Sequence, residues 1–200
     1  MPARVAGIAR EEAAVHIFQA IRGRRSVRAY LPTPLTRGEL EALVDAAVQA
    51  PSALNHQAWA FVVIEDKALL ARYSTRIKPL VLAGLPATGL SAQFEKTLAD
   101  PGYHVFYDAP ALIAICARGN DPFATIDCCL AAQNLMLAAH GMGLGSCFIG
   151  LSQGWLNQDS VKEELGLPRD WTVVAPIVVG HPSGPAPPAP TRRAPEVKWR

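Results

Sequence analysis

The chain has 200 residues, of which 50% are hydrophobic and 18% are charged, and its formal net charge is +2. This length suits one domain with a sizeable core, and the near-neutral charge argues against a general nucleic-acid binder, which usually presents a broad basic face. The mean hydropathy of +0.15 is high for a soluble chain of this size. It indicates either an unusually thick core or apolar surface buried against a second copy, and we favour an obligate homodimer.

The sequence shows no signal for export, for membrane insertion or for metal binding. Residues 1–14 lack the apolar run of a secretory signal, and no stretch is apolar enough to span a membrane. The four cysteines form no C-x-x-C pair, so we expect buried, reduced thiols in a cytoplasmic protein. The five histidines lack metal-ligand spacing, and we expect no metal site.

In residues 11–51, the sequence pattern predicts two helices joined by an extended segment. Apolar residues spaced i, i+3, i+4 and i+7 predict a helix over Glu11–Arg22. Residues Arg24–Tyr30 then run extended. A capping box formed by Thr36 and Glu39 starts the second helix, which has a single apolar stripe and ends before Pro51.

The rest of the chain alternates between apolar runs and helical patterns. The runs predict buried strands at Trp59–Ile64, Ala111–Ala117, Ser146–Ile149 and Trp171–Gly180. Helices are expected at Lys67–Ser74, Phe123–His140 and Ser160–Leu165. Residues 77–102 have no clear period, and long irregular segments are often lids or binding loops. These patterns indicate one layered α+β or α/β domain over residues 1–200.

The last twenty residues differ in composition from everything before them. Residues 181–200 are rich in proline and cannot form a packed core alone. They form either a disordered tail or a stiff polyproline arm that docks on a partner subunit. The second interpretation accounts for the late Arg192, Arg193 and Trp199.

An arginine cluster lies in the stretch IRGRRSVRAY, where four arginines fall within seven positions: Arg22, Arg24, Arg25 and Arg28. In an extended segment Arg24, Ser26 and Arg28 share one face, and the two arginines lie roughly 13 Å apart at about 3.3 Å per residue. This spacing suits an elongated anion with two electron-rich poles, with Arg22 and Arg25 pointing elsewhere. A solvated basic turn that complements the end of the preceding helix remains the alternative.

Two later stretches carry groups that could contact a ligand. In APSALNHQAW, the side chains of Ser52, Asn55 and Gln57 could read a planar polar ring, but they also favour ordinary turns and caps. In GMGLGSCFIG, residues 141–150, glycines permit close backbone approach to a ligand or simply stop a helix. This stretch follows a helix rather than a strand, so it is a poor dinucleotide-binding fingerprint.

Taken together, these motifs resemble one protein family in order and spacing. RRSVR, PSALNHQAWAF, GLGSCFIG and a late arginine pair are similar to the motifs of the nitroreductase family of FMN-dependent oxidoreductases. The resemblance runs from about residue 17 to residue 199 and is weakest between residues 77 and 102. It implies an α+β fold with a mixed sheet flanked by helices, and an intertwined homodimer with two FMN sites at the interface.

The resemblance also implies which residues bind FMN. Arg24 and Ser26 would hold the phosphate with contacts from Arg25, and Arg28 would face the pyrimidine end of the ring. The loop that reaches the flavin of the other subunit would supply Pro51, Ser52, Ala53, Asn55 and Gln57. The backbone along the ring would come from Ile149, Gly150 and Leu151, and the phosphate would be capped by Arg192 and Arg193.

Two positions depart from the family's pattern. Ala58 stands where the family commonly has proline, which frees the loop slightly but removes no ligand group. Ala53 stands where a second serine is frequent, which would remove one hydrogen bond to the flavin.

The implied activity is an electron transfer through the flavin. FMN would take a hydride from NADH or NADPH and reduce small planar electrophiles such as nitroaromatics or quinones, so we name no catalytic side chain. Because the same fold supports other reactions, a flavin-binding protein for storage, sensing, dehalogenation or flavin fragmentation is the alternative. A third hypothesis, a basic-loop module for nucleic acid or phosphopeptide, is disfavoured by the low net charge.

Overall fold

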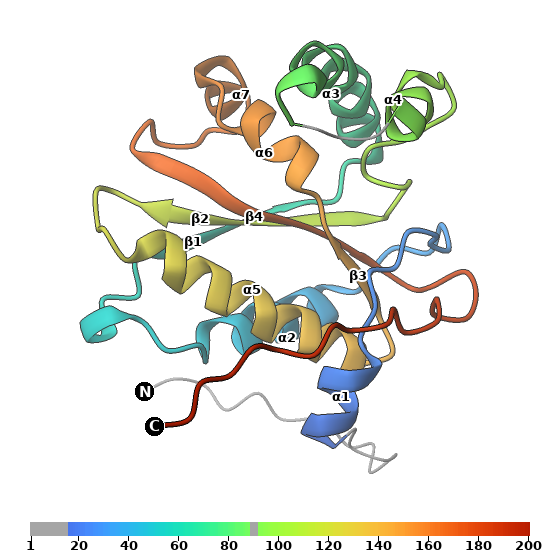
Figure 1. Cartoon of the computed structure of the whole chain (residues 1–200). Coiled ribbons are helices and arrows are strands. Elements are labelled where there is room, and N and C mark those ends of the chain that lie inside the picture. Colours follow the sequence, from blue (N-terminus) through green and yellow to red (C-terminus); the bar gives the residue numbers. More distant parts are fainter. Residues whose placement is uncertain (1–15, 89–91) are drawn as a thin grey trace.

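A four-stranded sheet lies between two layers of helices (Figure 1). The structure is a computed structural model that describes residues 16–88 and 92–200. In chain order its elements are α1 (Ile17–Gly23), α2 (Arg37–Val48), the 3-10 helix η1 (Ala53–Asn55), β1 (Trp59–Ile64), α3 (Lys67–Thr88), α4 (Ala92–Ala99), β2 (Ala111–Arg118), α5 (Ala124–Gly141), β3 (Gly145–Phe148), α6 (Gly150–Leu156), α7 (Asp159–Glu164) and β4 (Trp171–Gly180). Figure 1 shows α1, α2 and α5 on one side of the sheet, and α3, α4, α6 and α7 on the other.

The strands follow the order β1-β2-β4-β3, and each neighbouring pair is antiparallel. The α+β class is therefore confirmed, but the expected mixed sheet needs one correction. In the described part of the chain, parallel pairing occurs only at the isolated bridge between Ser26 and Ser146. Strand direction could not be predicted from the apolar runs, because a strand buried on both faces looks alike in either direction.

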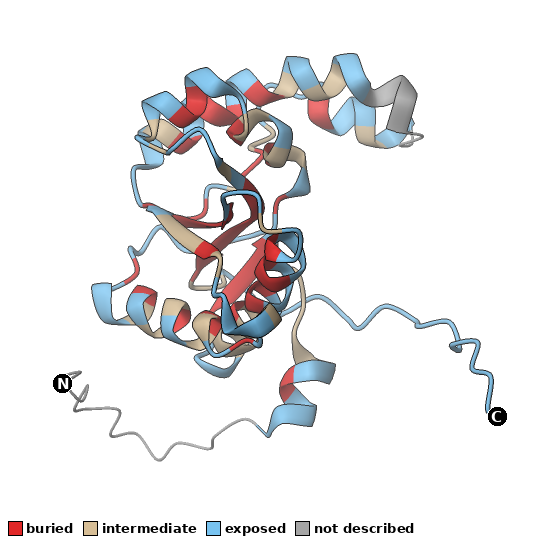
Figure 2. Ribbon diagram, turned by 90° about the vertical axis from the view of Figure 1, so that its left-hand side faces the viewer, coloured by how far each residue is buried: buried red, intermediate tan, exposed pale blue. Residues whose placement is uncertain are grey.

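The two central strands are apolar on both faces, and this places a core on each side of the sheet. Ile113 and Ile115 of β2 belong to the core shared with α2 and α5. Leu112 and Cys116, which alternate with them, belong to the core shared with α3 and α6. Figure 2 shows the resulting buried band running through the middle of the molecule, with exposed residues outside it.

Two helices confirm the signals that predicted them. At the start of α2, the Thr36 hydroxyl accepts a bond of 3.2 Å from the Glu39 N–H, and the Glu39 carboxylate accepts one of 2.7 Å from the Thr36 N–H. This is the predicted capping box. The apolar helix α5 runs across the face of the sheet, contacting all of its strands, as its composition indicated.

Three elements differ from the sequence-based prediction. The first helix begins at Ile17, because His16 is its extended N-cap; residues 11–15 of the predicted helix lie outside the described residues. The helix predicted to end at Ser74 instead continues to Thr88 as α3, and part of the irregular segment 77–102 is helical. The short helix α6 was not predicted, because its glycines resemble helix breakers.

Gly145 lets the extended N-terminal segment lie directly against β3. A Cβ at this position would lie 2.8 Å from both Cβ and Cγ1 of Val27, whose N–H donates to the Ser146 carbonyl at 3.0 Å. We expect Gly145→Ala to lower the free energy of unfolding by about 1–3 kcal/mol, because the added methyl overpacks this contact. Urea denaturation measures the change.

The matched control for this prediction is Gly154→Ala in α6, where an added Cβ meets no atom within 4 Å. It should not lower the free energy of unfolding, since alanine is the better helix former. Equal urea midpoints for Gly145→Ala and the wild type would contradict the close packing of the segment on β3.

Candidate functional site

The arginine-rich segment runs along the edge of the sheet. Helix α1 ends where the Arg24 N–H donates to the Ala20 carbonyl at 2.9 Å, and the chain then becomes extended. Ser26 pairs with Ser146 of β3, and Tyr30 pairs with Pro182 at the start of the C-terminal arm. These bridges hold the segment between the edge strand β3 and the arm.

A cavity of about 500 Å³ opens beside this segment. It is lined by Arg24, Arg25, Ser26, Arg28, Pro187, Pro188, Pro190 and Arg192. Five of the residues predicted to bind the cofactor therefore meet here, four from the extended segment and one from the arm. No carboxylate is among the lining residues, so the cavity is strongly cationic although the whole chain is nearly neutral.

The arginines that line the cavity have unsatisfied donors. The buried Nε atoms of Arg24 and Arg25 have no hydrogen-bond partner. Leaving such a buried donor unpaired is costly, so an anion bound here would stabilise both side chains. A phosphate group, with several acceptor oxygens, matches this arrangement of guanidinium groups.

Arg25 corrects the prediction from strict alternation, which placed its side chain away from the Arg24 face. Its Nη1 donates to the carbonyl oxygens of Arg22 and Arg24, both at 2.7 Å. The long side chain thus folds back over the backbone and reaches the same cavity. Arg22 is exposed and does not line the cavity.

Arg28 lies at an aromatic cluster. Its guanidinium lies 5.8 Å from the centroid of the Tyr107 ring, and the Tyr103 hydroxyl donates to the Tyr107 hydroxyl at 3.2 Å. Burial acts to lower the pKa of Arg28, but the neighbouring Cys147 and Tyr107 raise it overall. The guanidinium therefore stays protonated and presents a fixed positive charge. Tyr107 was missed from the sequence, since nothing local relates it to Arg28.

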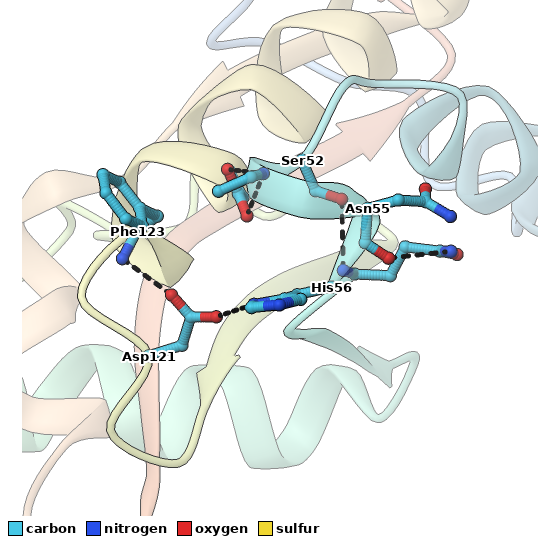
Figure 3. Close-up of polar contacts among 8 residues, drawn as sticks. Ser52, Asn55, His56, Asp121 and Phe123 are labelled. Atoms are coloured by element: carbon cyan, nitrogen blue, oxygen red, sulfur yellow. Dashed lines mark hydrogen bonds and ion pairs between the residues drawn. The ribbon is translucent and has the colours of Figure 1, made fainter.

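The stretch PSALNHQ forms a loop around η1 at the start of α5 (Figure 3). The Ala53 N–H donates to both carboxylate oxygens of Asp127 at 3.2 Å, and the Gln57 N–H donates to the Ser52 hydroxyl at 3.1 Å. His56 Nδ1 lies 2.8 Å from a carboxylate oxygen of Asp121. The polar side chains of this loop are thus gathered at one end of the helix.

The loop and the arginine cavity lie at opposite ends of α5. Asp127, which binds the loop, is in the first turn, whereas His140 in the last turn packs against Gly23, next to Arg24. The thirteen residue steps from Asp127 to His140 correspond to roughly 20 Å at 1.5 Å per residue. The predicted loop residues Pro51, Ser52, Ala53, Asn55 and Gln57 accordingly do not line the arginine cavity of their own chain.

The third predicted stretch lies directly after β3. Ile149 is buried and its N–H donates to the Pro176 carbonyl at 2.8 Å, while Gly150 is exposed and begins α6 with Leu151. The i, i+4 spacing of Leu151 and Trp155 is the sequence signal that could have revealed this helix, which was not predicted. Arg193 is exposed on the arm and does not line the arginine cavity.

Metal ligands, membrane-spanning helices and cysteines were also considered in the sequence, and the structure bears on each. Within residues 16–88 and 92–200, no three His, Cys, Asp or Glu side chains are arranged to hold a metal ion. Among the helices that the structure describes, none combines the length and apolar character needed to cross a membrane. The four cysteines are unpaired; Cys129 is exposed, and the other three are buried.

Comparison with known proteins identifies the family. Residues 21–181 match the family model described as the Nitroreductase family. The chain belongs to the nitroreductase family. The resemblance predicted from four separate motifs is thereby confirmed.

Individual nitroreductase-family relatives cover most of the chain. A crystal structure of a nitroreductase with bound FMN from Bacteroides fragilis has 26% identity and a TM-score of 0.76, and the match covers 92% of this chain and 97% of that one. An FMN reductase (NADPH) from Bacillus subtilis is 31% identical over 171 residues, or 83% of this chain and 66% of the relative. A provisionally named NADH dehydrogenase/NAD(P)H nitroreductase from Archaeoglobus fulgidus is 28% identical over 164 residues, which are 80% of this chain and 81% of the relative.

Proposed function

We propose that this protein is an FMN-dependent oxidoreductase that takes electrons from NADH or NADPH and reduces small planar electrophiles such as nitroaromatics or quinones. The observation that carries the proposal is the cationic cavity, which Arg192 lines together with Arg24 and Arg25, whose buried Nε donors have no partner. The relatives support the cofactor, since one is bound to FMN and another is named for FMN reduction with NADPH.

The residues of the cavity fit the two ends of FMN. Its phosphate is nearly a dianion, and Arg24, Arg25 and Ser26 offer charge-assisted and hydroxyl hydrogen bonds at one end of the segment. Arg28 offers a second positive charge further along, where an electron-rich pyrimidine ring would meet it. When bound, FMN supplies hydride transfer between the nicotinamide and the acceptor. The chain itself binds, orients and stabilises negative charge.

A homodimer would complete this site. The predicted loop lies roughly 20 Å along α5 from the arginine cavity, so a loop that contacts the same flavin must come from a second copy. The loop tip is also uncovered, since Leu54 is 87% exposed. We therefore assign Ser52, Asn55 and Gln57 to the flavin of the partner subunit.

Exposed apolar faces on two helices support this assembly. They comprise Ile17, Phe18 and Ile21 on α1, together with Phe123, Ile126 and Leu130 at and along the start of α5. Both sets are spaced so that they share one side of their helix, and such patches commonly mark subunit interfaces. The C-terminal arm also supports a dimer, because residues 183–200 are exposed throughout and are free to contact a second subunit (Figure 2).

The test is an absorption spectrum of the purified protein, followed by anaerobic titration with NADH and NADPH and then a panel of acceptors. We expect a yellow protein whose flavin absorbance is bleached by at least one of the two donors and recovers with a nitroaromatic or quinone. A colourless preparation that FMN cannot reconstitute would overturn the proposal. Bound flavin without oxidation of NADH or NADPH by any acceptor would instead indicate a flavin-binding protein without reductase turnover.

A further inference from the structure

The carboxylate of Asp127 is nearly buried, and Asp127 is the only acidic residue of the predominantly apolar helix α5. The residue is 3% exposed, and its two oxygens accept hydrogen bonds from the Ala53 N–H at 3.2 Å. A buried carboxylate is expensive without partners, and the first turn of α5 offers only partial compensation through the helix dipole. The contact with Ala53 is therefore the interaction that accounts for an acidic residue at this position.

The loop that Asp127 holds has an unfavourable backbone conformation. Leu54, Asn55 and Gln57 have φ values of 49°, 56° and 51°, in the left-handed region that non-glycine residues rarely adopt. Residues at such angles persist only when surrounding contacts over-determine them. Burial does not supply those contacts, because residues 54–57 are all exposed.

Polar contacts hold the loop instead, and two of them end on α5 or just before it (Figure 3). Ala53 binds Asp127, and His56 binds Asp121, whose other oxygen accepts from the Phe123 N–H at 2.8 Å. The hydrogen bond from His56 lowers the pKa of Asp121, so this carboxylate is ionised at neutral pH. A long helix thus acts as a rigid template for the loop.

We propose that Asp127 is a positioning residue for the flavin: by fixing the Ala53 N–H, it holds Ser52 and Asn55 in the conformation that contacts FMN in the partner subunit. This inference rests on the proposed function and names a residue that does not itself touch the cofactor. Asp121 and His56 form a second, more exposed clamp on the same loop.

The first test compares two substitutions of Asp127. Asp127→Ala should raise the dissociation constant of FMN about tenfold, because the Ala53 N–H loses its acceptor and the loop relaxes. Asp127→Asn should stay within about threefold of the wild type, since its amide oxygen still accepts this bond. Asp159→Asn, in the exposed first turn of α7, is the control and should leave FMN affinity unchanged.

Measurements on the FMN-free protein separate positioning from general stability. Amide hydrogen exchange should show loss of protection at Ala53 in Asp127→Ala, while β2 and β4 remain protected. Unchanged protection at Ala53 would overturn the inference. So would an FMN affinity for folded Asp127→Ala equal to that of the wild type.

The second test removes the same hydrogen bond from the loop side. Ala53→Pro deletes the N–H, and the backbone accepts proline here because Ser52 is extended, with φ −133° and ψ 151°, and Ala53 opens η1. We expect a similar rise in the FMN dissociation constant. In the double variant with Asp127→Ala, the rise should be no larger than in the worse single variant, because both changes break one interaction.

The outcomes are distinguishable from failure of the proposed function. Fully additive effects of the two substitutions would overturn the positioning role alone, as would an Ala53→Pro protein that binds FMN normally. If Asp127→Ala does not fold, the affinity of Ala53→Pro decides the question. A wild-type protein that binds no FMN would overturn the proposed function together with this inference.

Discussion

Arg24→Ala should weaken FMN binding by roughly 1.5–3 kcal/mol, equivalent to about a 10- to 150-fold rise in the dissociation constant. The side chain lines the cationic cavity, and its buried Nε has no partner within the chain. An Nε–H donor that is already desolvated and unpaired makes a stronger charge-assisted bond to a phosphate than a solvated donor does. Quenching of FMN fluorescence on binding measures the change.

Two further variants define the origin of this effect. Arg24→Lys keeps the charge but loses the planar fork of donors, so its affinity should lie between those of the wild type and Arg24→Ala. Arg22→Ala is the matched control, because Arg22 is exposed and does not line the cavity. If Arg24→Ala binds FMN as tightly as Arg22→Ala does, the phosphate lies elsewhere.

Deletion of residues 184–200 should leave the fold intact but dissociate the proposed dimer. None of the deleted residues is buried, so thermal unfolding should lose no core contribution. Trp199 is 90% exposed, and an aromatic anchor in an interface is commonly worth about 2 kcal/mol or more. We therefore expect the dimer dissociation constant to rise at least about 30-fold, and FMN affinity to fall as Arg192 is lost.

Light scattering over a dilution series measures the dimer, and circular dichroism measures the fold. Trp199→Ala should reproduce much of the loss, whereas Lys198→Ala, at the neighbouring position, should not. A truncated chain that remains dimeric at the same dilution would show that the arm stays in solvent, which is the alternative interpretation of its composition.

Those parts of the fold that depend on local chemistry could be predicted from the sequence. The capping box of Thr36 starts α2, and the apolar run Ala111–Ala117 forms β2 almost residue for residue. The length of α3 could not be predicted, because Pro79 stands inside it and usually interrupts a helix. Tyr73 and Ile77 are fully buried on that helix, and their packing outweighs the lost hydrogen bond.

In the candidate site, too, the features within one short stretch of sequence could be predicted, and those that join distant residues could not. The arginines were recognisable because four of them lie within one short stretch, and the structure gathers three around a cavity. The hydrogen bond between Ala53 and Asp127 joins residues that are 74 positions apart in the sequence. The sequence around either residue therefore gives no sign of the other. The separation of the loop from the arginines by the length of α5 is likewise a property of the folded chain alone.

Helix α5 packs into the core on one side and lies at the proposed subunit interface on the other, and this limits which substitutions it can accept. One side of the helix packs Cys128, Ala131 and Leu135 into the core, and the other presents Ile126 and Leu130 outward. In the proposed dimer, a newly acquired charge along much of the helix would be buried either within one subunit or between two. Neutral substitutions should therefore accumulate more slowly in α5 than in the short helix α7, most of whose residues are exposed to solvent.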